Sequence, residues 1–146
     1  MSTIQHTGCG YEAAGRDAKL VPKVVNKICR ALRKRINDFD GIVISGYSMA
    51  LIGPIVAFKL KKNVCVVSKE NDARNSYQKV EGLHSQRWLM IDDLVSSGRT
   101  LSRVADGVKR IEGTLVGVVL YFSTAKGNAC GYCGIRVPIW QSFLCE

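Results

Sequence analysis

Residues 88–101 read WLMIDDLVSSGRTL, and this stretch decides the fold. Its first four residues are apolar, as in a strand that is buried on both faces. Two adjacent carboxylates follow, Asp92 and Asp93, and then a short polar turn. From Leu101 to Ile111, apolar residues recur every three or four positions, which is the spacing of a helix. The stretch therefore predicts a strand, a loop and a helix in succession.

The loop between the predicted strand and helix has the composition of an anion-binding site. A helix N-terminus presents unpaired N–H groups and a positive dipole end, which suit a phosphate group. Gly98 lets the backbone approach a ligand closely. Three hydroxyl side chains of the turn can donate hydrogen bonds: Ser96, Ser97 and Thr100. Asp92 and Asp93 repel a phosphate but suit sugar hydroxyls, directly or through a metal ion, so we interpret the loop as a site for ribose 5-phosphate.

Residues 91–101 resemble the phosphoribosyl-pyrophosphate (PRPP) signature of the type I phosphoribosyltransferases. The shared features are an apolar strand, two acids, two apolar residues and a small-hydroxyl-Gly-x-Thr turn. The resemblance implies that Asp92 and Asp93 are catalytic and bind the ribose hydroxyls, with magnesium as the cofactor close by. It also implies that the 5-phosphate is bound by Ser96, Ser97, Gly98, Arg99 and Thr100.

The resemblance extends to most of the chain. In the family, the loop after the first core strand binds pyrophosphate, and the matching residues here are Ser45, Gly46, Tyr47 and Ser48. A basic residue that closes the next strand corresponds to Lys69, which is expected to bind pyrophosphate and to take part in catalysis. A mobile loop then closes over the reacting centre. Its counterpart here is residues 70–84, with Arg74 and Lys79 as its cations.

The nucleobase is selected in this family by a hood made from terminal segments, which would be residues 1–19 and 123–146. Candidates for stacking on the base are Trp140, Tyr132 and Phe143. Members that act on 6-oxopurines commonly carry an acid at the fifth signature position, where this chain has Ser96. A serine hydroxyl does not accept a proton near neutral pH, so orotate is the favoured base and adenine the next. A homodimer is expected.

The rest of the chain predicts an α/β protein. Apolar segments at 41–45, 63–68, 88–91 and 114–122 are predicted strands, and segments at 21–38, 49–61 and 101–111 are predicted helices. Their alternation favours a mainly parallel, doubly wound sheet that binds ligands at the carboxyl ends of its strands. We expect a single domain over residues 1–146, with its core at about 20–122. No segment is typical of a membrane span or signal peptide, so we expect a cytoplasmic protein.

Two other functions compete with phosphoribosyl transfer. The net charge of +9 and a basic helical stripe at Lys23, Lys27, Arg30 and Lys34 would suit a non-catalytic, PRPP-sensing regulatory or RNA-binding protein. Nucleic acid is not the favoured partner, because such stripes are usually solvated and this one lacks aromatic residues.

A serine hydrolase is less favoured still. Residues 46–50 (GYSMA) resemble a nucleophile elbow, but the one later histidine, His84, lies in a polar loop before the acids.

The cysteines are expected to be mainly reduced thiols, with Cys29 and Cys65 in the core. Cys130 and Cys133 form half of a possible zinc site. Cys9, Cys145 or His6 would have to complete it, and reduced loop thiols are the favoured interpretation.

Overall fold

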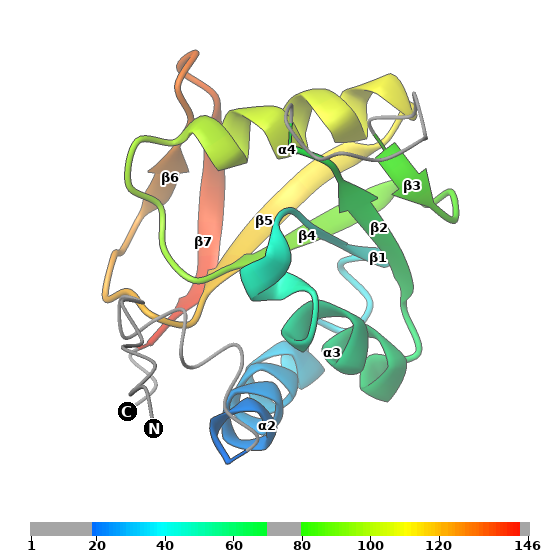
Figure 1. The fold of residues 1–146 in the computed structure, drawn as a ribbon, viewed down its shortest axis with the longest axis vertical. Coiled ribbons are helices and arrows are strands. Elements are labelled where there is room, and N and C mark those ends of the chain that lie inside the picture. Colours follow the sequence, from blue (N-terminus) through cyan, green and yellow to red (C-terminus); the bar gives the residue numbers. More distant parts are fainter. Residues whose placement is uncertain (1–18, 70–79, 144–146) are drawn as a thin grey trace, which may run out of the picture.

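In the computed structural model, residues 19–69 and 80–143 are described, and they form a seven-stranded sheet in the order β3-β2-β1-β4-β5-β7-β6 (Figure 1). The strands are β1 (Gly41–Ile44), β2 (Asn63–Val67), β3 (Val80–Gly82), β4 (Arg87–Asp92), β5 (Thr114–Leu120), β6 (Asn128–Cys130) and β7 (Arg136–Ser142). The helices are α2 (Leu20–Leu32), η1 (Arg33–Arg35), η2 (Tyr47–Met49), α3 (Ile52–Leu60) and α4 (Arg99–Arg110). The five central strands are parallel, and the edge strands β3 and β6 are antiparallel to their neighbours.

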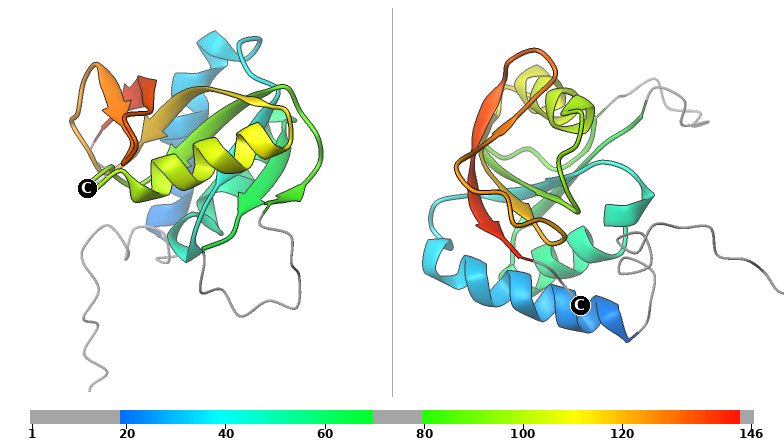
Figure 2. Two further views of the ribbon diagram at one scale, coloured as in Figure 1. Left: turned by 90° about the horizontal axis from the view of Figure 1, so that it is seen from above. Right: turned by 90° about the vertical axis from the view of Figure 1, so that its left-hand side faces the viewer.

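Helices cover both faces of the sheet, with α2 and α3 on one face and α4 on the other (Figures 1 and 2). Side chains alternate along β1, so Ile42 and Ile44 pack toward α2 and α3 while Val43 packs toward α4. The predicted α/β class with a mainly parallel sheet is confirmed. Within these two described ranges, no helix combines the length and apolar character that crossing a bilayer requires.

The C-terminal tail contributes more to the sheet than the sequence predicted. Residues 114–122 were expected to hold the last strand, but β7 continues the sheet in parallel with β5, and β6 pairs with β7. The reason is packing between distant segments: the Trp140 ring covers the space above Gly117, where a side chain would collide with it. The tail therefore forms the edge of the sheet next to β5.

The predicted mobile loop, residues 70–84, extends too far at its C-terminal end. Residues 80–82 form β3, which pairs with β2, so this part of the loop prediction is wrong. A methyl group at Gly107 of α4 would meet the side chains of Val67 and Val80, which shows how closely α4 covers this edge. Arg74 and Lys79 lie outside the described residues.

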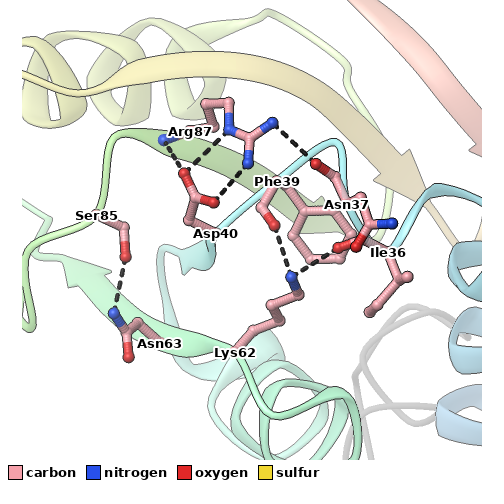
Figure 3. A network of polar contacts seen from close by, with 8 residues as sticks. All are labelled: Ile36, Asn37, Phe39, Asp40, Lys62, Asn63, Ser85 and Arg87. Atoms are coloured by element: carbon pink, nitrogen blue, oxygen red, sulfur yellow. Dashed lines mark hydrogen bonds and ion pairs between the residues drawn. The ribbon is translucent and has the colours of Figure 1, made fainter.

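A polar network joins the amino-terminal ends of the central strands (Figure 3). The Arg87 guanidinium donates two hydrogen bonds to the Asp40 carboxylate, at 2.7 and 3.1 Å, and one to the Asn37 carbonyl at 2.8 Å. The Lys62 ammonium donates to the carbonyl oxygens of Ile36 (2.6 Å) and Phe39 (2.7 Å). The network ties β1, β2 and β4 together at the end of the sheet where the strands begin.

Replacing Asp40 tests this network. The hydrogen bond from Arg87 lowers the pKa of Asp40, so the stabilisation exists above the usual value of 3.8 and disappears as pH falls through the lowered pKa. We expect Asp40→Asn to reduce the free energy of unfolding at neutral pH, with the difference from wild type vanishing in acid. Urea titrations across this pH range measure it. Asp38→Asn is the control, since the contact of Asp38 with Arg35 is longer, at 3.8 Å, and it should have less effect.

Candidate functional site

The predicted phosphate loop, acidic pair and pyrophosphate loop lie around one cavity at the carboxyl ends of β1, β2 and β4. The cavity has a volume of about 240 Å³. It is lined by Ser45, Ser48, Lys69, Asp92, Asp93, Leu94, Val95, Ser96, Ser97, Gly98, Arg99, Thr100 and Leu101. Parallel strands bring these segments together because their carboxyl ends share one edge of the sheet. The lining is polar, as binding of a sugar phosphate requires.

Asp92 is the last residue of β4 and is buried, with 5% of its surface exposed. Its Oδ1 accepts a hydrogen bond from the Asp93 N–H at 2.9 Å, and Asp93 Oδ1 accepts one from the Leu94 N–H at 2.7 Å. Burial raises the pKa of Asp92 well above its usual value, and the neighbouring Asp93 carboxylate raises it further. The charge of Lys69 acts in the opposite direction. The site therefore favours a ligand that stabilises the buried Asp92 carboxylate by donating hydrogen bonds to it or by placing a positive charge beside it.

This burial predicts that Asp92 destabilises the unliganded protein at neutral pH. A carboxyl whose pKa is raised by folding stabilises the fold fully only below its unfolded value of 3.8, and that stability is lost as pH rises through the folded value. We expect Asp92→Asn to raise the free energy of unfolding by about 1 to 2 kcal/mol at pH 7. The gain should shrink to nothing below pH 3.8.

Urea titrations at several pH values measure this gain. Asp106→Asn, an exposed change on α4, should give no such gain and is the control. Equal or lower stability of Asp92→Asn at neutral pH would contradict the argument.

The phosphate loop reaches α4 through Gly98, which precedes the first helical residue with φ of 78° and ψ of 3°. Gly98 has no side chain that could cap this helix N-terminus, and residues 97–101 line the cavity. Ser97 Oγ accepts only a long hydrogen bond, 3.4 Å, from the Arg99 N–H. The helix end is thus available to an anion.

The β6–β7 hairpin supports this loop, which the sequence did not predict. A Cβ at Gly98 would lie 2.5 Å from the Cys130 carbonyl oxygen and 2.9 Å from Gly131 Cα. The Tyr132 N–H donates a hydrogen bond to the Gly98 carbonyl at 3.3 Å, and the Arg99 guanidinium carbon lies 5.8 Å from the centroid of the Tyr132 ring. The one local signal was the pair of glycines around Tyr132, at 131 and 134, which marks a tight turn.

Gly98→Ala tests whether close packing holds the loop. The left-handed conformation alone should cost on the order of 1 to 2 kcal/mol, and the collision with the hairpin backbone adds to it. Gly127→Ala is a matched control, because Gly127 has a φ of 88° but a Cβ there would meet no atom of the described residues within 4 Å. We expect Gly98→Ala to lower the unfolding temperature more than Gly127→Ala and, unlike it, to weaken binding of inorganic phosphate. Equal effects of the two changes would mean that the hairpin contact does not position the loop.

The pyrophosphate loop and Lys69 also meet at a glycine. Gly46 has a φ of 86°, and a Cβ there would lie 3.0 Å from Lys69 Cε and 3.2 Å from Lys69 Nζ. The absence of a side chain at position 46 therefore lets the lysine cross the loop. Next to it, Ser45 is 4% exposed, and its hydroxyl has no hydrogen-bond partner within the described part of the chain. A buried polar atom in a cavity wall is suited to a polar ligand.

Two of the three aromatic residues predicted to stack on a base lie elsewhere. The Trp140 ring packs edge-on against Phe39, at a centroid distance of 5.9 Å, with the Arg35 guanidinium 4.8 Å from its centroid. Phe143 packs against the same core, and the Lys27 ammonium lies 5.3 Å from the centroid of its ring. Neither lines the cavity, because their side chains face α2. Only Tyr132, 69% exposed, lies beside the phosphate loop.

The competing sites receive little support. His84 follows β3 near Asn63, at the end of β2 opposite the cavity, so it is not placed to activate Ser48. Cys130 and Cys133 are exposed free thiols. Within residues 19–69 and 80–143, no three or more His, Cys, Asp or Glu side chains come together as a metal site. The other possible zinc ligands, His6, Cys9 and Cys145, lie outside the described residues.

The fold is that of the type I phosphoribosyltransferases. The chain superposes on orotate phosphoribosyltransferase from Aeropyrum pernix with a TM-score of 0.65 and 13% identity, over 86% of this chain and 73% of that one. The values for adenine phosphoribosyltransferase from Thermoanaerobacter pseudethanolicus are 0.58 and 21%, over 73% and 70%. For orotate phosphoribosyltransferase from Francisella tularensis they are 0.60 and 15%, over 91% and 68%. The sequence matches no protein-family model and no curated protein.

Proposed function

We propose that this protein is a phosphoribosyltransferase, which transfers the ribose 5-phosphate group of PRPP to a nucleobase and releases pyrophosphate. The observation that carries the proposal is the single cavity in which two adjacent carboxylates, a helix N-terminus and a lysine meet. Each group suits a different part of one substrate. The shared fold supports the same conclusion, since solved proteins of this fold include adenine and orotate phosphoribosyltransferases.

Each segment of the cavity is assigned to one part of PRPP. Asp92 and Asp93 accept hydrogen bonds from the ribose hydroxyls, and residues 96–100 bind the 5-phosphate at the start of α4. The loop 45–48 and Lys69 bind the pyrophosphate group. Ser45 supplies a hydroxyl to this end, which accounts for its burial without a partner among the described residues.

Departure of pyrophosphate leaves positive charge on the ribose carbon C1, so the site must stabilise separated charges and exclude water. Lys69 stabilises the negative charge that grows on the leaving group. The buried Asp92 and Asp93 hold the ribose in position and favour the developing positive charge. Arg74 and Lys79 are proposed to add positive charge when the mobile loop closes.

Magnesium fits this donor set. Asp92 and Asp93 offer two adjacent carboxylates at the cavity wall, and Mg²⁺ typically uses one or two carboxylates together with substrate phosphates and waters. Bound there, the ion would neutralise the pyrophosphate group. The raised pKa of Asp92 indicates that its charged form is destabilised, and a bound cation would stabilise that form.

We propose orotate as the base, with adenine next. Ser96 stands where an acid would accept the proton of a 6-oxopurine, and the net charge of +9 suits an anionic base. Tyr132 is exposed beside the phosphate loop. Among the described aromatic residues it is the best placed to contact the base.

The test is an assay of pyrophosphate release from PRPP with orotate, adenine and hypoxanthine. We expect turnover with orotate or adenine, dependent on Mg²⁺, and a loss on the order of 100-fold or more in the Asp92→Asn/Asp93→Asn variant. Asp106→Asn should retain full activity. Unchanged kinetics in a folded double variant would contradict the roles of the two acids, and faster turnover of hypoxanthine would contradict the base assignment.

A regulatory protein is the second candidate, because Lys23, Lys27 and Arg30 of α2 and Lys34 of η1 are all exposed. Tight PRPP binding without turnover of any base, together with salt-sensitive retention on RNA, would favour it.

A further inference from the structure

A pair of cysteines lies at the tip of the β6–β7 hairpin, outside the candidate cavity. Residues 130–135 read CGYCGI, so two residues separate Cys130 from Cys133. Both side chains are exposed free thiols. Among residues 19–69 and 80–143, no third metal-ligating side chain gathers with them as a metal site. The pair is therefore accessible to reagents in solution, and the proposed function gives it no role.

The hairpin turn places the two cysteines at the same bend of the chain. Cys130 is the last residue of β6 and pairs with Arg136. The Gly134 N–H donates a hydrogen bond to the Gly131 carbonyl at 3.2 Å, and Gly134 has a φ of 77°, so the turn that contains Cys133 is closed. The Cys130 thiol donates to the same Gly131 carbonyl at 3.5 Å. The Cys130 sulfur therefore lies against the turn that carries Cys133.

We propose that Cys130 and Cys133 are a site of reversible oxidation, where a low-molecular-weight disulfide such as oxidised glutathione closes a bond between them. The thiolate of one cysteine attacks a sulfur of the reagent, so a mixed disulfide forms and one glutathione thiolate leaves. The second cysteine thiolate attacks the protein sulfur of the mixed disulfide, which forms the Cys130–Cys133 bond and releases the second glutathione thiolate. Two protein thiols are thus oxidised, and the two glutathione thiolates take up their protons.

The surroundings direct this reaction to the hairpin. Cys29 and Cys65 are buried, and burial raises the pKa of the Cys29 thiol and raises the pKa of Cys65 to about 11. At neutral pH these two thiols supply little of the thiolate that the exchange requires. Arg99 and Arg136, by contrast, are exposed cations near the pair, and they favour the approach of an anionic reagent such as oxidised glutathione.

A disulfide at this site would be easily reduced again. It closes a ring over only two intervening residues, so it restricts the unfolded chain little and adds little stability. Exposed disulfides are typically the labile ones, because a thiolate reaches their sulfur atoms readily. These properties suit a bond that forms and breaks with the thiol–disulfide balance of the surroundings.

The backbone between the two cysteines contacts the phosphate loop and the start of α4 (Figure 1). The Tyr132 N–H donates to the Gly98 carbonyl at 3.3 Å. A Cβ at Gly131 would lie 2.7 Å from Ser102 Oγ, so Gly131 has no room to move toward α4. Drawing the cysteines together therefore displaces Tyr132 instead. Its hydrogen bond is already long, so a small displacement breaks it, and we infer that oxidation loosens residues 98–102.

Peptide mapping of the full-length chain tests whether the bond forms. The reduced protein is equilibrated with oxidised and reduced glutathione in varied ratios, free thiols are alkylated, and digests are analysed by mass spectrometry. We expect a Cys130–Cys133 disulfide that dithiothreitol reverses fully. Cys130→Ser and Cys133→Ser should each keep glutathione on the remaining cysteine. Linkage to Cys9 or Cys145, linkage between chains, zinc held by both thiols, or no reaction at the pair would overturn the proposal.

Amide hydrogen exchange tests the effect on the loop without any substrate. Residues 98–102 should exchange at least about threefold faster in the oxidised wild type than in the reduced wild type. Cys133→Ser treated with the same oxidant is the matched control, because it cannot close the bond, and its exchange at these residues should not change. Equal exchange in the two states of the wild type would overturn the link between the cysteine pair and the loop.

Inorganic phosphate separates this inference from the proposed function. In titration calorimetry, phosphate should bind the oxidised wild type at least about threefold more weakly than the reduced form, because the loosened loop no longer holds its N–H groups in place. This readout alone rests on the proposed role of residues 96–100. Binding to neither form would contradict that role, while peptide mapping and amide exchange would still decide this inference. Equal affinity for both forms would overturn the effect of the disulfide on the loop.

Discussion

Everything at the candidate site depends on two adjacent carboxylates fixed at the end of a fully buried strand. From Trp88 to Asp92, every residue of β4 is buried, because β1 and β5 flank the strand and helices cover both of its faces. The packing therefore shields most of Asp92 from solvent, and only its cavity side is accessible. Desolvation and the charge of Asp93 raise its pKa, and the hydrogen bond from the Asp93 N–H and the charge of Lys69 offset this only partly. A bound sugar or cation can offset the remaining cost of burying the charged Asp92 carboxylate. The group that destabilises the unliganded protein is therefore also the group that a ligand would stabilise.

The loops around these carboxylates come from distant parts of the chain, and two glycines let them touch. At Gly46 the missing side chain gives room to Lys69, and at Gly98 it gives room to the backbone of the β6–β7 hairpin. Both glycines also have positive φ, which other residues adopt only at a cost. The cavity is thus shaped by backbone contacts as much as by side chains. The hairpin reaches the start of α4 only because β7 adds to the sheet beside β5.

The strand, loop and helix around Asp92, and the two preceding strands, could be predicted because each is encoded by a local pattern. The segments that line the cavity followed from the rule that parallel strands share their carboxyl edge. The hairpin could not be predicted in this way. In β7, Pro138 and a register shift interrupt the alternation, and its pairing with β5 depends on Trp140 covering Gly117. For the same reason Trp140 and Phe143 were expected at a base, although they complete the core beneath α2.

The neighbouring helices α2 and α3 cover the same face of the sheet, yet their outer sides differ in a way that packing against the sheet does not require. The outer side of α2 and η1 is basic, with Lys23, Arg30 and Lys34 exposed, and water solvates it well. The outer side of α3 is apolar, and exposing it to water is unfavourable. The net charge of +9, to which the basic side of α2 contributes, favours the approach of a polyanionic ligand.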